Sequence, residues 1–360
     1  MTNTSNHIKG FDSLRAISIL LVVCTHLGLY RFFEPSFFLK TRVWSLCSGL
    51  TGVQIFFTIS GFLITHLLFK EKLRNNTINI RHFFIRRFIR LLPPLLLFYI
   101  LLLFTMLVGW IPFNSMGILF SVFYLYNFIP NIFYSGELGH MWSLSVEEQF
   151  YLFWPFVLAY VTRFKLLIWG VIILLIICLF GTYVLPSLTL HYKTNQFPLQ
   201  STFQLERWFV PAIAPVMIGA LTATILHFKF EQMKRIVVKG KACLIAASLL
   251  FLSPLYLPAC FLPVGSFFQS IGIGIFLLLI FFNQESKVVY YFNNQWLAYI
   301  GKISYGIYVY QGFFLRTGPG GKLWVQQFPV NICCTIILAI LSFEWYEKKI
   351  LKLKVRFAGA

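Results

Sequence analysis

Three polar segments interrupt an otherwise apolar chain, and the first contains an arginine and a histidine on one apolar run. Arg15 and His26 are eleven residues apart in the sequence. On a helix that rises about 1.5 Å per residue, His26 would lie roughly 16 Å further along the axis than Arg15. A neutral imidazole can take a proton from a hydroxyl near neutral pH. Alternatively, His26 could bond to a neighbouring helix while Arg15 extends to the lipid headgroups.

The second segment is basic and has the sequence RRFIRLLPP over residues 86–94. Arg87 and Arg90 are three residues apart, so on a helix they share a face and could bind one phosphate together. Arginines at the end of a membrane span also serve as anchors to anionic lipid. The segment therefore indicates either an anion site or a membrane anchor.

The third segment, HMWSLSVEEQF over residues 140–150, contains two adjacent carboxylates. On a helix, the side chains of Glu147 and Glu148 point about 100° apart, so one of them should face the protein interior. Acidic residues at the start of an apolar helix can also cap it, with Ser143 or Ser145 as the N-cap residue. A cap accounts for one glutamate and leaves the second for chemistry.

The composition of the whole chain indicates that these polar segments lie within an apolar environment. Of the 360 residues, 58% are hydrophobic, 19% are aromatic and only 11% are charged, which is about half the charged fraction of a soluble domain. With a mean hydropathy of +0.77, the chain cannot be a soluble enzyme, a disordered tail or a coiled coil, and we expect a polytopic membrane protein. The net charge of +19 would suggest nucleic acid in a soluble chain. In a membrane protein it reflects basic cytoplasmic loops, so we expect no nucleic-acid partner.

Apolar stretches of roughly 20 residues are long enough to span a bilayer. Ten such stretches are found at 13–32, 48–69, 90–111, 144–162, 166–186, 208–228, 242–259, 264–283, 296–315 and 325–346. With both termini in the cytoplasm, the inner segments hold 22 basic residues and the outer segments seven, as the positive-inside rule requires. We therefore predict an all-α membrane protein of about ten transmembrane helices, in which residues 1–360 form one membrane domain.

A further apolar stretch at 116–133 does not fit as an eleventh span. It would move the lysine-rich loop at 229–241 and the basic tail to the outer side, against the charge rule. We expect it to be an interfacial or re-entrant element on the outer face. The cysteines form no CxxC pair, and we expect no metal site.

Two polar segments within spans have simpler alternatives. The segment at 52–62 carries Gly and Ser at a spacing that allows close helix packing. The segment at 301–311 stacks hydroxyl groups along one span, and either a polar cavity wall or an interfacial aromatic belt would explain it.

Together these motifs resemble the acyltransferase-3 family of integral membrane acyltransferases, whose members O-acetylate lipopolysaccharide O-antigens, exopolysaccharides and other surface glycans. The matching elements occur in the family's order over nearly the whole chain. They are Asp12-Ser13-Leu14-Arg15-Ala16 with His26, Gly52 to Phe62, Arg87-x-x-Arg90 with Pro93, Trp142 to Phe150, Ser304-Tyr305, and Phe343-Glu344 with Glu347-Lys348.

The resemblance implies an acyl donor such as acetyl-coenzyme A arriving from the cytoplasm and an acceptor hydroxyl on the outer face of a bacterial inner membrane. It implies catalytic roles for His26, Arg15, Glu147 and Glu148. It implies binding of the donor phosphates by Arg86, Arg87 and Arg90. It implies substrate contacts by Trp142, Ser143, Ser304 and Tyr305.

On this basis we expect His26 to deprotonate a sugar hydroxyl that then attacks the thioester, with a transient acyl-histidine as an alternative. Two positions depart from the family's pattern, since Gln54 stands where an acidic residue is common and Gln311 lies near the place of a common histidine. We expect no soluble esterase-like domain of the kind that some relatives append, and we therefore expect the membrane domain and the outer loops 112–143 and 187–207 to handle the acceptor. Acyl transfer to a small molecule or a lipid, and transport of a lipid-linked saccharide without chemistry, are the alternative functions.

Overall fold

The computed structural model describes most of the chain. The described residues are 8–29, 43–192, 203–238, 240–258, 261–316, 318 and 321–353. Within these ranges the regular structure is helical, without a β-strand, and one isolated bridge pairs Pro130 with Phe203. Part of the predicted outer loop 187–207 falls outside the described residues. The predicted all-helical fold is confirmed for the part of the chain that is described.

The helices vary widely in length. They are α1 (Phe11–His26), α3 (Val43–Leu46), α4 (Gly49–Asn75), α5 (Ile80–Leu107), α6 (Ser115–Val122), α7 (Met141–Tyr160), α8 (Phe164–Tyr192), α10 (Phe209–Ala212), α11 (Ala214–Phe228), α12 (Phe230–Val238), α13 (Lys241–Phe251), α14 (Ser253–Tyr256), α15 (Leu262–Phe282), α16 (Lys287–Phe292), α17 (Gln295–Phe314), α18 (Val330–Leu341) and α19 (Lys348–Leu351). A π-helical turn, Ser342–Glu347, joins α18 to α19.

Several helical stretches can cross a membrane by length and composition. Five of them are found among the described residues, at Val43–Asn75, Ile80–Leu107, Phe164–Val184, Pro263–Phe282 and Val330–Leu351. The shorter apolar helices α11 and α13 accompany them. The chain is therefore a membrane protein, while the number of crossings and the side of each terminus stay predictions.

The stretch at 116–133 does not form a spanning helix. Helix α6 has 8 residues, which corresponds to a length of about 12 Å, and short 3₁₀ turns follow it. Asn114 fixes this segment, because its side-chain oxygen accepts from the Gly117 N–H (2.8 Å) and its Nδ2 donates to the Phe133 carbonyl (2.7 Å). A bilayer core is about 30 Å thick, so the segment is too short to cross it as a helix, as predicted.

Two predicted spans are interrupted in the structure. The stretch at 208–228 is divided into α10 and α11, and the stretch at 242–259 is divided into α13 and α14. Pro211 lies inside α10, and a proline occupies the first turn of both α11 and α14. Proline lacks a backbone N–H, so helices start at it more easily than they continue through it.

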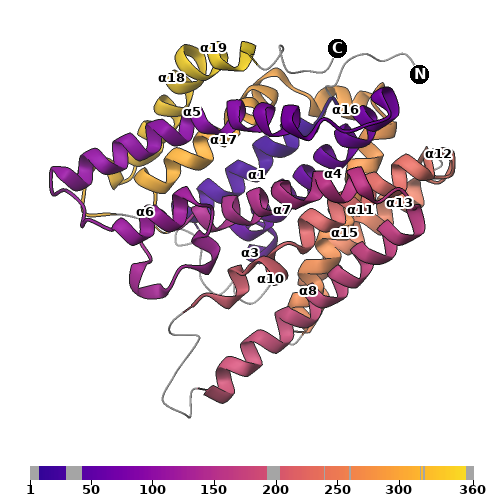
Figure 1. Ribbon diagram of the computed structural model, residues 1–360, viewed down its shortest axis with the longest axis horizontal. Helices are drawn as coiled ribbons and strands as arrows, with labels where there is room; N and C mark the ends of the chain where they lie inside the picture. The colour runs from indigo at the N-terminus through magenta and orange to yellow at the C-terminus, as the bar shows by residue number, and fades with distance from the viewer. Residues whose placement is uncertain are drawn as a thin grey trace.

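Helix α1 packs between α4 and α17, at the centre of the bundle (Figure 1). Two glycines allow this close approach. A Cβ at Gly52 would lie 2.5 Å from the Ser18 carbonyl oxygen, and a Cβ at Gly301 would lie 1.9 Å from that of Asp12. The Ser18 hydroxyl also donates to the Gly52 carbonyl (2.5 Å). The position of α1 is therefore set at backbone distance from both neighbours.

The same type of contact joins α4 to α11. A Cβ at Gly61 would lie 1.9 Å from the Val216 carbonyl oxygen, and a Cβ at Gly219 would lie 2.0 Å from that of Thr58. Close contact through small residues is the usual way in which helices associate within lipid. The packing interpretation of the 52–62 segment is thus confirmed.

We expect Gly61→Ala to destabilise the protein by about 1–3 kcal/mol, because the added methyl group forces α4 and α11 apart. Thermal unfolding of the purified protein in detergent would measure the change. Gly170→Ala in α8 is the matched control, since no atom lies within 4 Å of a Cβ at that position. An unchanged unfolding temperature for Gly61→Ala would contradict the close contact.

Candidate active site

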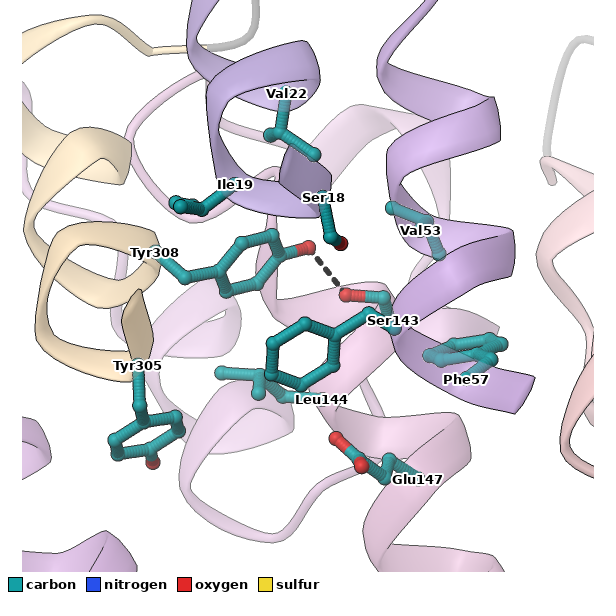
Figure 2. A pocket seen from close by; sticks show the side chains of 11 residues that line it. Ser18, Ile19, Val22, Val53, Phe57, Ser143, Leu144, Glu147, Tyr305 and Tyr308 are labelled. Carbon is teal, nitrogen blue, oxygen red and sulfur yellow. Dashed lines mark hydrogen bonds between the residues drawn. The ribbon is translucent and has the colours of Figure 1, made fainter. Parts of the chain in front are cut away.

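Helices α1, α4, α5, α7 and α17 surround two adjoining cavities. The first, called here the basic cavity, has about 420 Å³ of empty space, which includes space open to solvent. Its lining residues are Arg15, Phe56, Ser60, Leu63, Arg87, Arg90, Leu91, Glu147, Tyr151 and Tyr305. The second, called here the apolar cavity, has about 350 Å³ of empty space, which also includes space open to solvent. Its lining residues are Ser18, Ile19, Val22, Val53, Phe56, Phe57, Ser143, Leu144, Glu147, Tyr305 and Tyr308 (Figure 2).

The two cavities adjoin each other, because Phe56, Glu147 and Tyr305 line both of them, and together they are called here the passage. The order of residues along the helices gives the passage a direction. On α1 the lining residues run from Arg15 in the basic cavity to Val22 in the apolar cavity, and His26 follows one helical turn later. The passage therefore leads from a cationic end towards the C-terminal end of α1.

Positive charge at the cationic end exceeds negative charge. Arg15 forms an ion pair with Asp12 (3.2 Å). The Arg87 guanidinium lies over the Tyr151 ring, 4.1 Å from its centroid, and neither Arg87 nor Arg90 has a carboxylate within salt-bridge distance in the described part of the chain. Unbalanced charge next to apolar walls favours the binding of an anion, since the surroundings screen it weakly.

Among the described residues that line the two cavities, Glu147 is the one with a carboxylate. It is buried, and its Oε1 accepts hydrogen bonds from the Ser60 hydroxyl and the Tyr151 hydroxyl. Glu148 is half-buried, does not line either cavity, and has no hydrogen bond or ion pair among the described residues. Of the two adjacent glutamates, Glu147 faces the interior.

The interpretation of the serines as helix caps is wrong. Helix α7 begins at Met141, before either serine. The Ser143 hydroxyl donates to the His140 carbonyl (3.1 Å), and the Ser145 hydroxyl donates to the Met141 carbonyl (2.9 Å). Because the helix starts earlier than predicted, both hydroxyls bond back to carbonyls of the preceding turn. Ser143 also hydrogen-bonds the Tyr308 hydroxyl on the wall of the apolar cavity (Figure 2).

His26 has a defined partner on α17. Its Nδ1 lies 3.2 Å from Oε1 of Gln311. With the Gln311 amide in this orientation, its oxygen accepts from Nδ1–H, and the lone pair of Nε2 is then left available. His26 does not line either cavity itself but follows Val22 beyond the apolar cavity. This arrangement suits a base that takes a proton at the far end of the passage.

A second histidine packs close to the same part of α17. His140 is buried, and a Cβ at Gly312 would lie 1.9 Å from its ring carbon Cε1. Its ring contacts Phe98 and Tyr308 edge-on, with centroid separations of 5.3 and 5.6 Å. His140 therefore contributes to the aromatic packing that supports this end of the passage.

Comparison with known proteins agrees with this geometry. A family model described as an acyltransferase domain matches residues 8–346, which is nearly the whole chain. The chain belongs to the acyltransferase-3 family.

Several curated relatives of this acyltransferase-3 protein come from Staphylococcus aureus. A protein of strain COL provisionally named as an O-acetyltransferase, SACOL0978, is 28% identical over 95% of this chain. The O-acetyltransferase OatA of strain NCTC 8325 is 26% identical over 96% of this chain. In both cases the match covers 57% of the relative, so the chain spans little more than half of their length. No solved structure is significantly similar to the chain.

The remaining residues that the family resemblance singled out are spread more widely. Arg86 forms an ion pair with Glu71 (2.9 Å), and the Ser304 hydroxyl donates to the Gly301 carbonyl (2.9 Å). Neither Arg86 nor Ser304 lines the passage. Tyr305 lines both cavities, and Trp142 packs edge-on against Phe57 beside the passage.

Several residues of the passage were missed by reasoning from the sequence. They are Ser18, Ser60, Tyr151 and Tyr308. Helical spacing could have identified two of them, because Tyr151 follows Glu147 by four residues and Tyr308 follows Tyr305 by three. Of the hydroxyl groups in 301–311, those of Tyr305 and Tyr308 belong to residues that line a cavity wall.

We expect Glu147→Ala to destabilise the protein by about 1–3 kcal/mol, because the buried hydroxyls of Ser60 and Tyr151 lose their shared acceptor. Glu147→Gln retains an acceptor oxygen and should cost less. Glu148→Ala, one residue away on the same helix, is the control and should leave the unfolding temperature nearly unchanged. Equal losses in Glu147→Ala and Glu148→Ala would contradict the assignment of Glu147 as the interior carboxylate.

Proposed function

We propose that the chain transfers an acetyl group from acetyl-coenzyme A to a hydroxyl of a cell-surface glycan. The observation that carries this proposal is the passage itself, which has unpaired arginines at one end and His26 beyond the other. The family membership and the O-acetyltransferase names of the relatives support the same reaction. Lipopolysaccharide O-antigen and exopolysaccharide are the glycan classes that the resemblance implies.

The basic cavity suits the phosphate end of the donor. Coenzyme A carries its negative charges at one end and its thioester at the end of a long uncharged arm. Arg15, Arg87 and Arg90 would bind the phosphates, and the mostly apolar walls of the next cavity would surround the arm. We leave Arg86 out of this set because it lines neither cavity and its guanidinium pairs with Glu71.

The distance along α1 fits this division of roles. Helix α1 is continuous from Phe11 to His26, so Arg15 and His26 are separated by roughly 16 Å along the axis. Phosphates at Arg15 and a thioester near His26 would therefore belong to one extended donor molecule. The outer loops 112–143 and 187–207 would bring the acceptor to the histidine end.

The proposed reaction depends on which ring nitrogen of His26 carries the proton. Its Nε2 takes the proton of the acceptor hydroxyl while the hydroxyl oxygen attacks the thioester carbonyl carbon. As the new C–O bond forms, the C–S bond breaks, and the departing sulfur takes the proton from the imidazolium. The products are an O-acetyl ester and coenzyme A, and the histidine returns to its neutral form.

Gln311 would have two functions in this step. Its Oε1 holds the proton of His26 on Nδ1, which keeps Nε2 free to act as the base. Its Nε2 is buried and has no hydrogen-bond partner in the described part of the chain. This amide is therefore a candidate donor to the negative charge that develops on the thioester oxygen.

The charge distribution supports an orientation in the membrane. We place both termini and the basic cavity on the cytoplasmic side of a bacterial inner membrane, with about ten transmembrane helices. Arg87 and Arg90 of the basic cavity belong to the segment that the positive-inside rule assigns to the cytoplasm, where acetyl-coenzyme A is made. The acceptor then approaches from the opposite side.

We expect His26→Ala to lower kcat for acetyl transfer by about 10²–10⁴-fold, the usual contribution of a positioned general base. Release of coenzyme A from radiolabelled acetyl-coenzyme A would measure the rate, with thermal unfolding as the check on folding. Gln311→Leu should lower kcat more than it changes KM, and Gln311→Glu, which keeps an acceptor for Nδ1, should restore part of the loss. Near-normal turnover by folded His26→Ala would overturn the mechanism and favour transport without chemistry.

We expect Arg90→Gln to weaken binding of acetyl-coenzyme A by about 10–100-fold, because a charge-assisted hydrogen bond contributes about 1.5–3 kcal/mol. Isothermal titration calorimetry would measure the dissociation constant. Arg81→Gln, at an exposed position on the same helix, is the charge-matched control and should bind like the wild type. If the wild type, Arg90→Gln and Arg81→Gln bind acetyl-coenzyme A with equal affinity, Arg90 is a membrane anchor and not part of the donor site.

A further inference from the structure

An arginine that the proposed mechanism does not use lies beside the histidine end of the passage. Arg207 is the last residue of the 3₁₀ turn Leu205–Arg207. Its guanidinium carbon lies 5.6 Å from the ring centroids of both Tyr134 and Trp142. Trp142 directly precedes Ser143, which lines the apolar cavity. Through its contact with Trp142, Arg207 thus lies next to the apolar cavity, at the end of the passage opposite Arg90.

The charge of Arg207 is not neutralised by the described residues around it. Its guanidinium makes cation–π contacts with the two aromatic rings, and no carboxylate lies within salt-bridge distance of it in the described ranges. Arg316, also predicted to face the outer side, differs in this respect because Glu137 binds it at 2.8 Å. A guanidinium held by aromatic faces still has N–H groups free to donate.

This combination suits an anionic sugar. Aromatic rings such as Tyr134 and Trp142 can stack on a sugar ring, and a guanidinium binds carboxylate or phosphate through two parallel hydrogen bonds. A neutral glycan would leave the half-buried charge of Arg207 without a partner. The coenzyme A phosphates cannot occupy this position while they bind Arg87 and Arg90 at the other end.

We propose that Arg207 binds a negatively charged group of the acceptor, a carboxylate or a phosphate, and thereby selects acidic glycans. This inference rests on the proposed acyl transfer, because it assigns the histidine end of the passage to the acceptor. Arg207 is a specificity-determining residue here and takes no part in proton transfer.

Paired probes that differ in charge test the proposal with the full chain in lipid nanodiscs. The first pair is a hexuronate oligosaccharide and the same oligosaccharide after reduction of its carboxyl groups. The second pair is a prenyl-phosphate-linked sugar and the same sugar as an uncharged prenyl glycoside. Dissociation constants are measured at fixed ionic strength for the wild type, Arg207→Gln and Arg207→Lys. Lys322→Gln, which removes an exposed charge from the same predicted face, is the control.

We expect the wild type and Lys322→Gln to bind the acidic member of at least one pair about tenfold more tightly than its neutral counterpart. Arg207→Gln should bind both members equally, and Arg207→Lys should retain part of the preference. A preference in the first pair identifies a carboxylate, and a preference in the second identifies a phosphate. The absence of any preference in the wild type, or its survival in Arg207→Gln, would overturn the inference.

Coenzyme A release by the same preparations separates this inference from the proposed function. If the wild type releases coenzyme A but shows no preference for the acidic probes, only the proposed role of Arg207 is overturned. A preference that depends on Arg207, in a folded protein that neither binds nor cleaves acetyl-coenzyme A, would overturn acyl transfer and leave an anion-binding site.

Discussion

Helix α1 can lie between α4 and α17 only because positions 52 and 301 have no side chain. At both positions a Cβ would meet a carbonyl oxygen of α1 at 2.5 Å or less. Close contact of this kind fixes a helix in translation as well as in direction. Arg15 and His26 therefore occupy two fixed points on one rigid element, and the rest of the site is arranged around α1.

Polar contacts between helices then hold the walls of the passage together. Ser60 of α4 bonds Glu147 of α7, Ser143 of α7 bonds Tyr308 of α17, and His26 of α1 bonds Gln311 of α17. Within a bilayer, water does not compete for such groups, so each pair specifies which helices are neighbours. The residues assigned to chemistry are thus also residues that determine the helix arrangement.

The sequence predicted many properties that depend on one helix at a time, but not the breaks within 208–228 and 242–259 or the early start of α7. Apolar length located the helical stretches, and the spacing of Arg87 and Arg90 placed both on one face, which lines the basic cavity. Contacts between helices could not be derived in this way. Gln311 is 285 residues from His26, and the pairing of Arg86 with Glu71 depends on a helix that starts at Ile80, ten residues before the predicted span. Spacing along the chain defines faces, but it does not tell which faces meet.

The apolar middle of the passage also has a consequence for the membrane as an electrical barrier. Ile19, Val22, Val53 and Leu144 present hydrocarbon to the space between the cationic end and His26. Narrow apolar sections disfavour a continuous file of water, and fixed positive charges repel cations and protons. In the orientation proposed above, such a bundle would let a long donor reach across the bilayer while the ion gradients across that bilayer are kept intact.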